Sequence, residues 1–264
     1  MRYGMPTMIE TDTLTRCAEV CRDLGLDFVE LNINFPQYQL SKLDAGELNR
    51  LAASYGIGYT IHLDDEMSIA DFNGYVAEGY RKTALDAIEL AKNIGAKVLN
   101  MHMSRGAKYT LPDRVVFFFE AYEEDYLEKI RVFRDACTEA IGDSGILICV
   151  ENTNGFLPWQ QRAVELLLES PAFGLTFDIG HNYCAADGDE AWILAHMDRL
   201  HHFHIHDAKD GRKDHLALGK GELDAKRYLA LAEGCGATVV LETKTVAGLG
   251  ESVDYVRAWQ QDRN

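Results

Sequence analysis

Residues 202–224 read HFHIHDAKDGRKDHLALGKGELD and carry the most informative pattern in the chain. His202, His204 and His206 alternate with two apolar residues, which is the period of a strand with one polar and one apolar face. Three imidazoles on one face are not ordinary core, because each neutral ring needs both a hydrogen-bond donor and an acceptor. A polar loop with a further histidine, His215, follows the strand. We therefore predict that this stretch forms one wall of a metal site.

The same alternation of a short β-rich run, a polar loop and a helical stretch continues in both directions along the 264 residues. Strands are predicted at 2–5, 28–32, 58–62, 96–102, 146–151, 173–178, 200–206 and 238–242. Helices are predicted at 11–24, 44–55, 75–93, 118–141, 159–169, 190–197, 226–233 and 252–261. Such alternation implies parallel strands with right-handed crossovers, and eight units close most simply into a (β/α)₈ TIM barrel. An open doubly wound sheet is the alternative, but no GxGxxG motif follows the first strand. With no linker in the sequence, we expect an α/β fold with a single domain over residues 1–264.

Composition limits the location and the partners of the chain. No run approaches the roughly 18 apolar residues of a membrane span, and the N-terminus lacks the apolar core of a signal peptide. We therefore expect a cytoplasmic protein with no membrane partner. The net charge of −16 repels phosphate backbones and argues against a nucleic-acid partner. The six cysteines show no CxxC spacing and are predicted to be reduced thiols.

Polar side chains stand at the carboxyl ends of the predicted strands. They are Asn32, His62, His102, Glu151, Asp178, His204 or His206, and Glu242. Active sites of barrels form at this mouth. Each residue taken alone could be an ordinary hydrogen-bonded strand end, but clustered carboxylates repel one another unless a cation is present. A mixed shell of oxygen and nitrogen suits Mn²⁺, Mg²⁺, Co²⁺ or Zn²⁺, so we predict a divalent metal ion here.

Four motifs in a fixed order carry a family resemblance. They are VENTNG (150–155), FDIGH (177–181), HIHDAKDGRKDHLALGKGELD (204–224) and LET (241–243). On these motifs the chain resembles the xylose-isomerase-like TIM-barrel superfamily. That superfamily comprises sugar and sugar-phosphate isomerases and epimerases, and also the metal-dependent apurinic endonucleases.

In the epimerase branch, the resemblance implies one metal ion held by Glu151, Asp178, His204 and Glu242. It also implies that Glu151 and Glu242 are catalytic and transfer a proton at a carbon beside a carbonyl through a cis-enediolate. Return of the proton on the opposite face gives epimerisation, whereas return at the neighbouring carbon gives aldose–ketose isomerisation. The remaining histidines would bind the small-molecule sugar or sugar phosphate, or a second metal ion. They are His62, His102, His181, His206 and His215.

The endonuclease branch uses three zinc ions and nine ligands, and it remains an alternative. Eight of the nine ligand positions are matched by His62, His102, Glu151, Asp178, His181, His204, His215 and Glu242, whereas the ninth, an aspartate in that branch, falls on Lys213. Lys213, the acidic charge and the form of the 204–224 loop favour sugar chemistry over a zinc phosphodiesterase. A non-catalytic barrel that binds metal and sugar is the third hypothesis.

Several smaller features have two interpretations each. Glu30 is either at the pocket floor or a structural acid paired with an arginine, and Trp159 is either a sugar platform or helix packing. Loop 63–74 is a lid or a solvated loop, and 117–130 is helical core or the face of a homo-oligomer. Whether the substrate carries phosphate stays open, although cations lie in the predicted mouth loops. These are Arg105, Lys108, Lys209, Arg212, Lys213 and Lys244.

Overall fold

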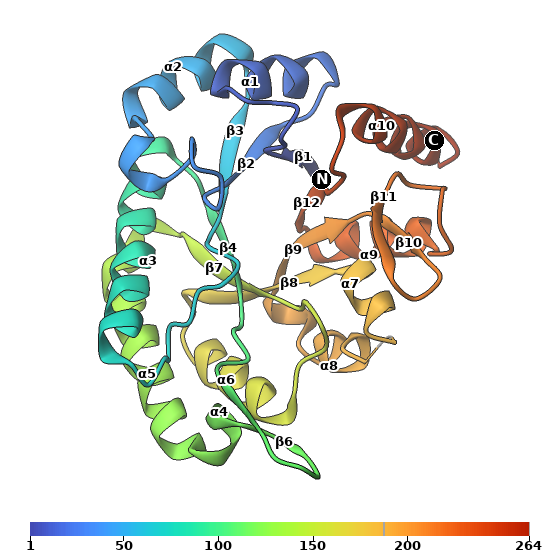
Figure 1. Ribbon diagram of the computed structural model, residues 1–264. Coiled ribbons are helices and arrows are strands. Elements are labelled where there is room, and N and C mark those ends of the chain that lie inside the picture. The colour runs from blue at the N-terminus through green and yellow to red at the C-terminus, as the bar shows by residue number, and fades with distance from the viewer. Residues whose placement is uncertain (187, 264) are drawn as a thin grey trace.

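The alternating runs form eight parallel strands that close into a barrel in the computed structural model, which describes residues 1–186 and 188–263 (Figure 1). The barrel strands are β1 (Arg2–Pro6), β2 (Phe28–Asn32), β3 (Gly58–His62), β4 (Val98–His102), β7 (Leu147–Glu151), β8 (Phe173–Asp178), β9 (Leu200–Ile205) and β12 (Thr238–Leu241). Around the barrel their order is β1-β12-β9-β8-β7-β4-β3-β2. The predicted (β/α)₈ TIM barrel is confirmed.

Strand alternation separates the apolar core from the polar mouth. In β9, Phe203 and Ile205 are fully buried on the face that meets the helices, whereas His202 and His204 point into the barrel. Leu31 in β2 and Ile61 in β3 are likewise fully buried. The outer faces of the strands therefore build the main core, and their inner faces are free to carry polar chemistry.

Helices surround the strands and follow the sequence signals closely (Figure 1). The main ones are α1 (Leu14–Asp23), α2 (Ala45–Tyr55), α3 (Gly74–Ile94), α5 (Glu123–Ile141), α6 (Pro158–Leu168), α8 (Glu190–Ala195), α9 (Ala225–Cys235) and α10 (Val246–Gln261). The side chains of Thr13 and Asp44 cap α1 and α2, and Gly95 ends α3 in the left-handed conformation. Helix α10 begins six residues earlier than the predicted 252, because Thr245 caps it and the two glycines in its first turns weaken the sequence signal. Among the described helices, none is both long and apolar enough to cross a membrane.

The segment before α5 was predicted wrongly as loop followed by one continuous helix. It instead forms a hairpin of β5 (Lys108–Thr110) and β6 (Val115–Phe117), which projects at the bottom of Figure 1, and then a short helix α4 (Phe118–Ala121). The helical conformation is interrupted at Tyr122, between α4 and α5. Trp159 is almost fully buried and its ring packs against those of Phe117, Phe119 and Tyr126, so it packs the helices and is not a sugar platform.

A second hairpin, β10 (Asp207–Lys209) and β11 (Lys213–Leu216), follows β9 and is organised by one buried acid. Asp207 accepts backbone N–H bonds from Ala208 and Leu223 at one carboxylate oxygen and from Gly219 and Gly221 at the other, at 2.8–3.1 Å. A Cβ atom on Gly221 would lie 2.3 Å from the Asp207 carboxylate. Gly219 and Gly221, the glycine pair of residues 202–224, thus allow the loop to close around the Asp207 carboxylate.

Replacing Asp207 with alanine is expected to lower the free energy of unfolding by about 2–4 kcal/mol, because four buried or half-buried N–H groups lose their acceptor. Urea unfolding measures the change. Asp254→Ala, at an exposed position on α10, is the matched control and should change stability little. Equal losses in the two variants would contradict this role of Asp207.

Candidate active site at the barrel mouth

The strand register brings the predicted site residues together at one end of the barrel. His102 of β4 pairs with Glu151 of β7, and Asp178 of β8 pairs with His204 of β9. Glu242 follows β12 directly, and its backbone N–H bonds to the carbonyl of Ile205. Residues that are far apart in sequence therefore share one small volume.

The centre of this volume is a group of three carboxylates and one imidazole. Ligand atoms of Glu151, Asp178, His204 and Glu242 all lie within 4.8 Å of one another, and all four residues are buried. Nδ1 of His204 is 3.0 Å from Oε2 of Glu242, 3.4 Å from Oε2 of Glu151 and 3.9 Å from Oδ2 of Asp178. The four residues implied by the resemblance as one ligand set thus converge on a common point.

The electrostatics of this centre depend on the pairing of acids with imidazoles. Burial alone would raise the pKa of Glu151, but the His204 and His102 imidazoles outweigh it and hold that pKa well below its ordinary value. Burial alone would lower the pKa of His204, but the carboxylates of Glu151, Glu30 and Glu242 raise it well above its ordinary value. The centre therefore requires positive charge.

The donor atoms of the centre fit a divalent ion. Nδ1 of His204 and Oε2 of Glu242 are buried, yet neither makes a hydrogen bond of suitable geometry within the part of the chain that the structure describes. Buried polar atoms almost always have a hydrogen-bond partner. Two adjacent buried atoms without one, an imidazole nitrogen and a carboxylate oxygen, are suited to bind a cation. Three carboxylate groups and one imidazole match the oxygen-rich shells of Mn²⁺, Mg²⁺, Co²⁺ and Zn²⁺.

Two asparagines that sequence reasoning missed hold the acids in place. Asn100 of β4 is fully buried and its amide donates to Oε2 of Glu151. Asn152 exchanges two 2.9 Å hydrogen bonds with the backbone of Asp178. Strand alternation was the available signal for Asn100, which shares a face with His102 in VLNMH.

His62 and His102 flank Glu151 on one side of the centre. Nδ1 of His62 lies 2.8 Å from the carbonyl of Leu63, so it carries the proton and leaves Nε2 directed at Glu151, 3.5 Å away. Nε2 of His102 is 3.1 Å from the same carboxylate oxygen. With Asp65, the two histidines form another group whose ligand atoms lie close enough to hold an ion.

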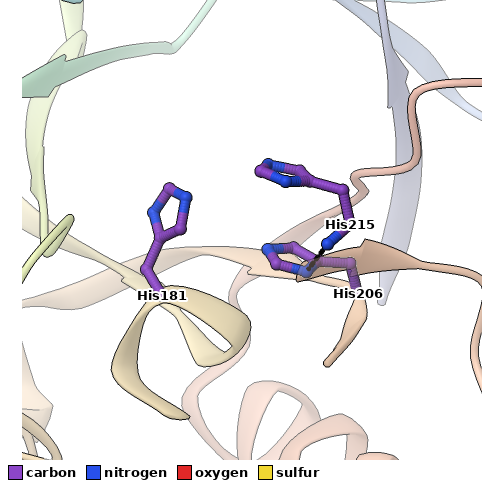
Figure 2. Close-up of side chains that lie close together, drawn as sticks. All are labelled: His181, His206 and His215. Atoms are coloured by element: carbon purple, nitrogen blue, oxygen red, sulfur yellow. Dashed lines mark hydrogen bonds between the residues drawn. The ribbon is translucent and has the colours of Figure 1, made fainter. Parts of the chain in front are cut away.

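His181 and His215 contact the two glutamates of the centre, and Figure 2 shows their rings beside that of His206. Nδ1 of His181, on the short helix α7 (Ile179–Cys184), is 3.3 Å from Oε1 of Glu151, and Nε2 of His215 is 3.4 Å from Oε1 of Glu242. Nδ1 of His215 lies 2.9 Å from the carboxylate of Asp214. Lys213 extends outward and pairs with Asp210.

His202 in β9 and His206 just after it are hydrogen-bonded within the protein interior. His202 bonds to Thr238 and to Glu30, so it is a core histidine with both ring nitrogens satisfied. Both ring nitrogens of the fully buried His206 are also bonded within the protein, so in this geometry neither is available to a substrate or a metal ion. Glu30 forms the pocket floor; its partners are histidines and Thr60, and the predicted pairing with an arginine is wrong.

Two cavities flank the acidic centre at the mouth. One of about 330 Å³ is lined by Asn32, Asn34, Glu242 and Lys244 among others. The other, about 440 Å³, includes His102, His181 and Asp214. The Lys244 ammonium lies 2.7 Å from Oε1 of Glu242, where it faces the first cavity. Together the cavities offer space for a small polar molecule on both sides of the glutamates.

A family model described as a xylose isomerase-like TIM barrel matches residues 18–259. The chain belongs to this family. Among curated relatives, an uncharacterised Methanocaldococcus jannaschii protein, MJ1614, is 24% identical over 97% of this chain and 98% of its own length. The Escherichia coli L-ribulose-5-phosphate 3-epimerase UlaE is 25% identical over 93% of this chain and 88% of its own. A probable endonuclease 4 of Mycobacterium leprae is 24% identical over 83% and 85%.

Solved structures of other proteins superpose along nearly the whole chain. A D-tagatose 3-epimerase-like protein gives a TM-score of 0.81 at 21% identity and covers 99% of this chain and 97% of its own. The IOLI protein, solved with a binding zinc atom, gives a TM-score of 0.75 at 15% identity with the same coverage. At these identities the likeness establishes the fold.

The imidazoles at the mouth predict a pH dependence for the metal-free protein. Burial works against protonation, but neighbouring carboxylates raise the pKa of His62 to about 9 and that of His181 to about 10, from an ordinary value of 6.5. Raised pKa values stabilise the fold fully below the ordinary value, and this contribution is lost as the pH rises through the folded-state values. We expect the Tm of chelated protein to fall between about pH 6.5 and 10.

Differential scanning fluorimetry across this pH range tests the expectation. Protein saturated with Mn²⁺ is the control, because an ion replaces the protons as the source of positive charge and should flatten the decline. A Tm of the chelated protein that stays constant or increases toward pH 10 would contradict the assignment of charge at the mouth.

Proposed function

We propose that this family member is a metal-dependent isomerase or epimerase acting on a sugar or sugar phosphate by proton transfer. The observation that carries the proposal is the convergence of two buried glutamates, Glu151 and Glu242, on Asp178 and His204 between two cavities. The L-ribulose-5-phosphate 3-epimerase UlaE among the relatives and the D-tagatose 3-epimerase-like protein among the structural neighbours support the same chemistry.

In the proposed site, Glu151, Asp178, His204 and Glu242 hold a divalent ion. When bound, such an ion polarises the carbonyl and hydroxyl oxygens of a sugar and makes the adjacent carbon acid stronger. The protein provides the groups that move the proton.

The two glutamates are oriented for proton transfer. Each directs Oε2 toward His204 and Oε1 away from it, toward His181 for Glu151 and toward His215 and Lys244 for Glu242. One glutamate takes the proton from the carbon beside the carbonyl, which gives an enediolate of the sugar, and the other returns it. Nearby imidazoles keep both acids ionised and thus able to accept a proton.

His181, His215 and Lys244 are the groups that we assign to substrate oxygens. All three present nitrogens at the margins of the glutamates, where a sugar hydroxyl or carbonyl would lie. The Lys244 ammonium is the charged donor that faces the cavity lined by Asn32 and Asn34, and amide and ammonium donors suit hydroxyl groups.

A zinc phosphodiesterase is the second candidate, favoured by two observations. His62 and His102 lie with Asp65 in a group that could hold an additional ion, and a probable endonuclease 4 is among the relatives. Lys213 turns away from the mouth, so the ninth ligand of a three-zinc site is not supplied from this position.

Elemental analysis combined with a substrate panel tests the proposal. We expect one divalent ion per chain and interconversion of at least one ketose or ketose phosphate. About three zinc ions per chain with cleavage of abasic DNA would contradict the proposal and support the phosphodiesterase. One ion with sugar binding but without turnover would support a non-catalytic barrel.

A further inference from the structure

His206 connects the acidic centre to the β10–β11 hairpin, and the role argued for it rests on the proposed function because it acts through Asp178. It lies between β9 and β10 and is fully buried. His215 lies on the hairpin and contacts Nδ1 of the His206 imidazole, whereas Asp178 ends β8 and contacts Nε2. His206 therefore contacts two parts of the site that come from separate segments of the chain.

The hydrogen bonds of His206 define its tautomer. Its Nδ1 accepts the backbone N–H of His215 at 2.8 Å, the bond drawn in Figure 2, whereas the carbonyl of Asp207 is more distant from this nitrogen, at 3.3 Å. Because Nδ1 is an acceptor, the proton of the neutral ring is on Nε2, which donates to Asp178 at 3.0 Å from Oδ1 and 3.1 Å from Oδ2. The rings of His181, His206 and His215 lie close enough to suggest a metal site of three imidazoles, but His206 has no lone pair left for it.

These bonds orient the carboxylate of Asp178. Oδ1 accepts both the 2.6 Å bond from the backbone N–H of His181, as the cap of α7, and the bond from His206. Oδ2 is the oxygen nearer the centre, 3.9 Å from Nδ1 of His204. The N–H of His181 on Oδ1 and the Nε2–H of His206, which is shared between Oδ1 and Oδ2, together fix the Asp178 carboxylate with Oδ2 nearer the centre.

The surroundings of His206 are shaped for its ring. A Cβ atom on Gly180 would lie only 2.0 Å from Cε1 of His206, so this glycine in FDIGH leaves the space the imidazole occupies. The rings of His206 and His215 stack with centroids 4.3 Å apart and 9° between planes. His215 itself has a left-handed backbone, φ 53°, that its N–H bond to His206 helps to hold.

We propose that His206 is a positioning residue that sets the ligand oxygen of Asp178 and, through the same ring, places His215 over the substrate. Outer carboxylate or imidazole partners of metal ligands commonly account for 10–100-fold in metal affinity. Since the ring links both segments, metal affinity and substrate affinity should depend on it together.

His206→Phe and His206→Gln separate this role from packing. Phenylalanine fills the space beside Gly180 without either hydrogen bond, whereas glutamine restores an amide donor that can reach Asp178. His201→Gln, on the outward face of β9, is the matched control. Calorimetric titration of metal-free protein with Mn²⁺ is the readout, accompanied by circular dichroism and Tm.

We expect the Kd for Mn²⁺ to rise about 10–100-fold in His206→Phe, less in His206→Gln, and not in His201→Gln. If His206→Phe does not fold, His206→Leu, which also lacks both hydrogen bonds, is titrated in its place by the same criterion. An unchanged Kd accompanied by a lower Tm would show a packing role and overturn the proposal. Loss of one of two bound ions with the other unaffected would make His206 a ligand and also overturn it. If the wild-type protein binds no divalent ion, the proposed function fails and this inference with it.

Discussion

Glu151→Gln is expected to lower the turnover of a ketose substrate by about 10³-fold or more, because it removes a group that accepts the substrate proton. The substitution keeps the size of the side chain and its contact with Asn100, but it takes away the negative charge that His102, His181 and His204 surround. An amide cannot act as a general base at neutral pH. Steady-state kinetics at saturating metal measures the loss as a fall in kcat.

The same loss is expected for Glu242→Gln, since both glutamates exchange a proton with the substrate in the proposed mechanism. Glu139→Gln, at an exposed position on α5, is the matched control and should retain full turnover. Both active-site variants must be assayed with metal content measured, because each also removes a proposed ligand. A variant that is fully metal-loaded and retains more than a tenth of the wild-type kcat would contradict the assignment of that glutamate.

Removal of the metal ion by a chelator is expected to abolish turnover and to lower the Tm of the protein. Three buried carboxylates at Glu151, Asp178 and Glu242 lose the cation that balances them. At a metal concentration one hundred times the Kd, binding contributes about 2.7 kcal/mol to stability, which is lost on chelation. Scanning calorimetry with and without Mn²⁺ measures this difference, and re-addition of the ion should restore both properties.

His204→Ala is the control for chelation. This variant lacks the imidazole of the ligand set, so chelator should change its Tm little and should not change its already low turnover. Wild-type turnover that survives complete removal of metal would rule out the proposed role of the ion.

The fold was predictable from sequence because its signals are local and repeated. Each βα unit carries its own strand period and caps, as at Thr13, Asp44 and Gly95, and eight units leave few ways to close the sheet. The hairpins β5–β6 and β10–β11 were missed, since they are short excursions within predicted loops. Helix α10 was predicted short because Gly248 and Gly250 weaken its helical pattern.

The convergence of the proposed ligands was predictable from sequence because barrel strands end at one mouth, which brings Glu151, Asp178 and Glu242 together whatever the loops do. The supporting bonds were not accessible. Asn100 could have been found from strand alternation, but the bonding of His206 depends on the exact path of the hairpin and on the space left by Gly180. From sequence alone, His206 was placed on the inward face and expected to contact a sugar or a second metal ion. In the structure, both of its ring nitrogens are hydrogen-bonded to other groups of the protein.

Solvent exchange at the substrate carbon tests the central claim most directly. A ketose that the metal-loaded protein converts is incubated in D₂O, and deuterium in substrate and product is located by NMR and mass spectrometry. Proton transfer by Glu151 and Glu242 predicts incorporation of one deuterium at the carbon beside the carbonyl, dependent on the ion and lost in both glutamine variants. Conversion without any incorporation of solvent deuterium, or incorporation that persists in Glu151→Gln, would contradict the account.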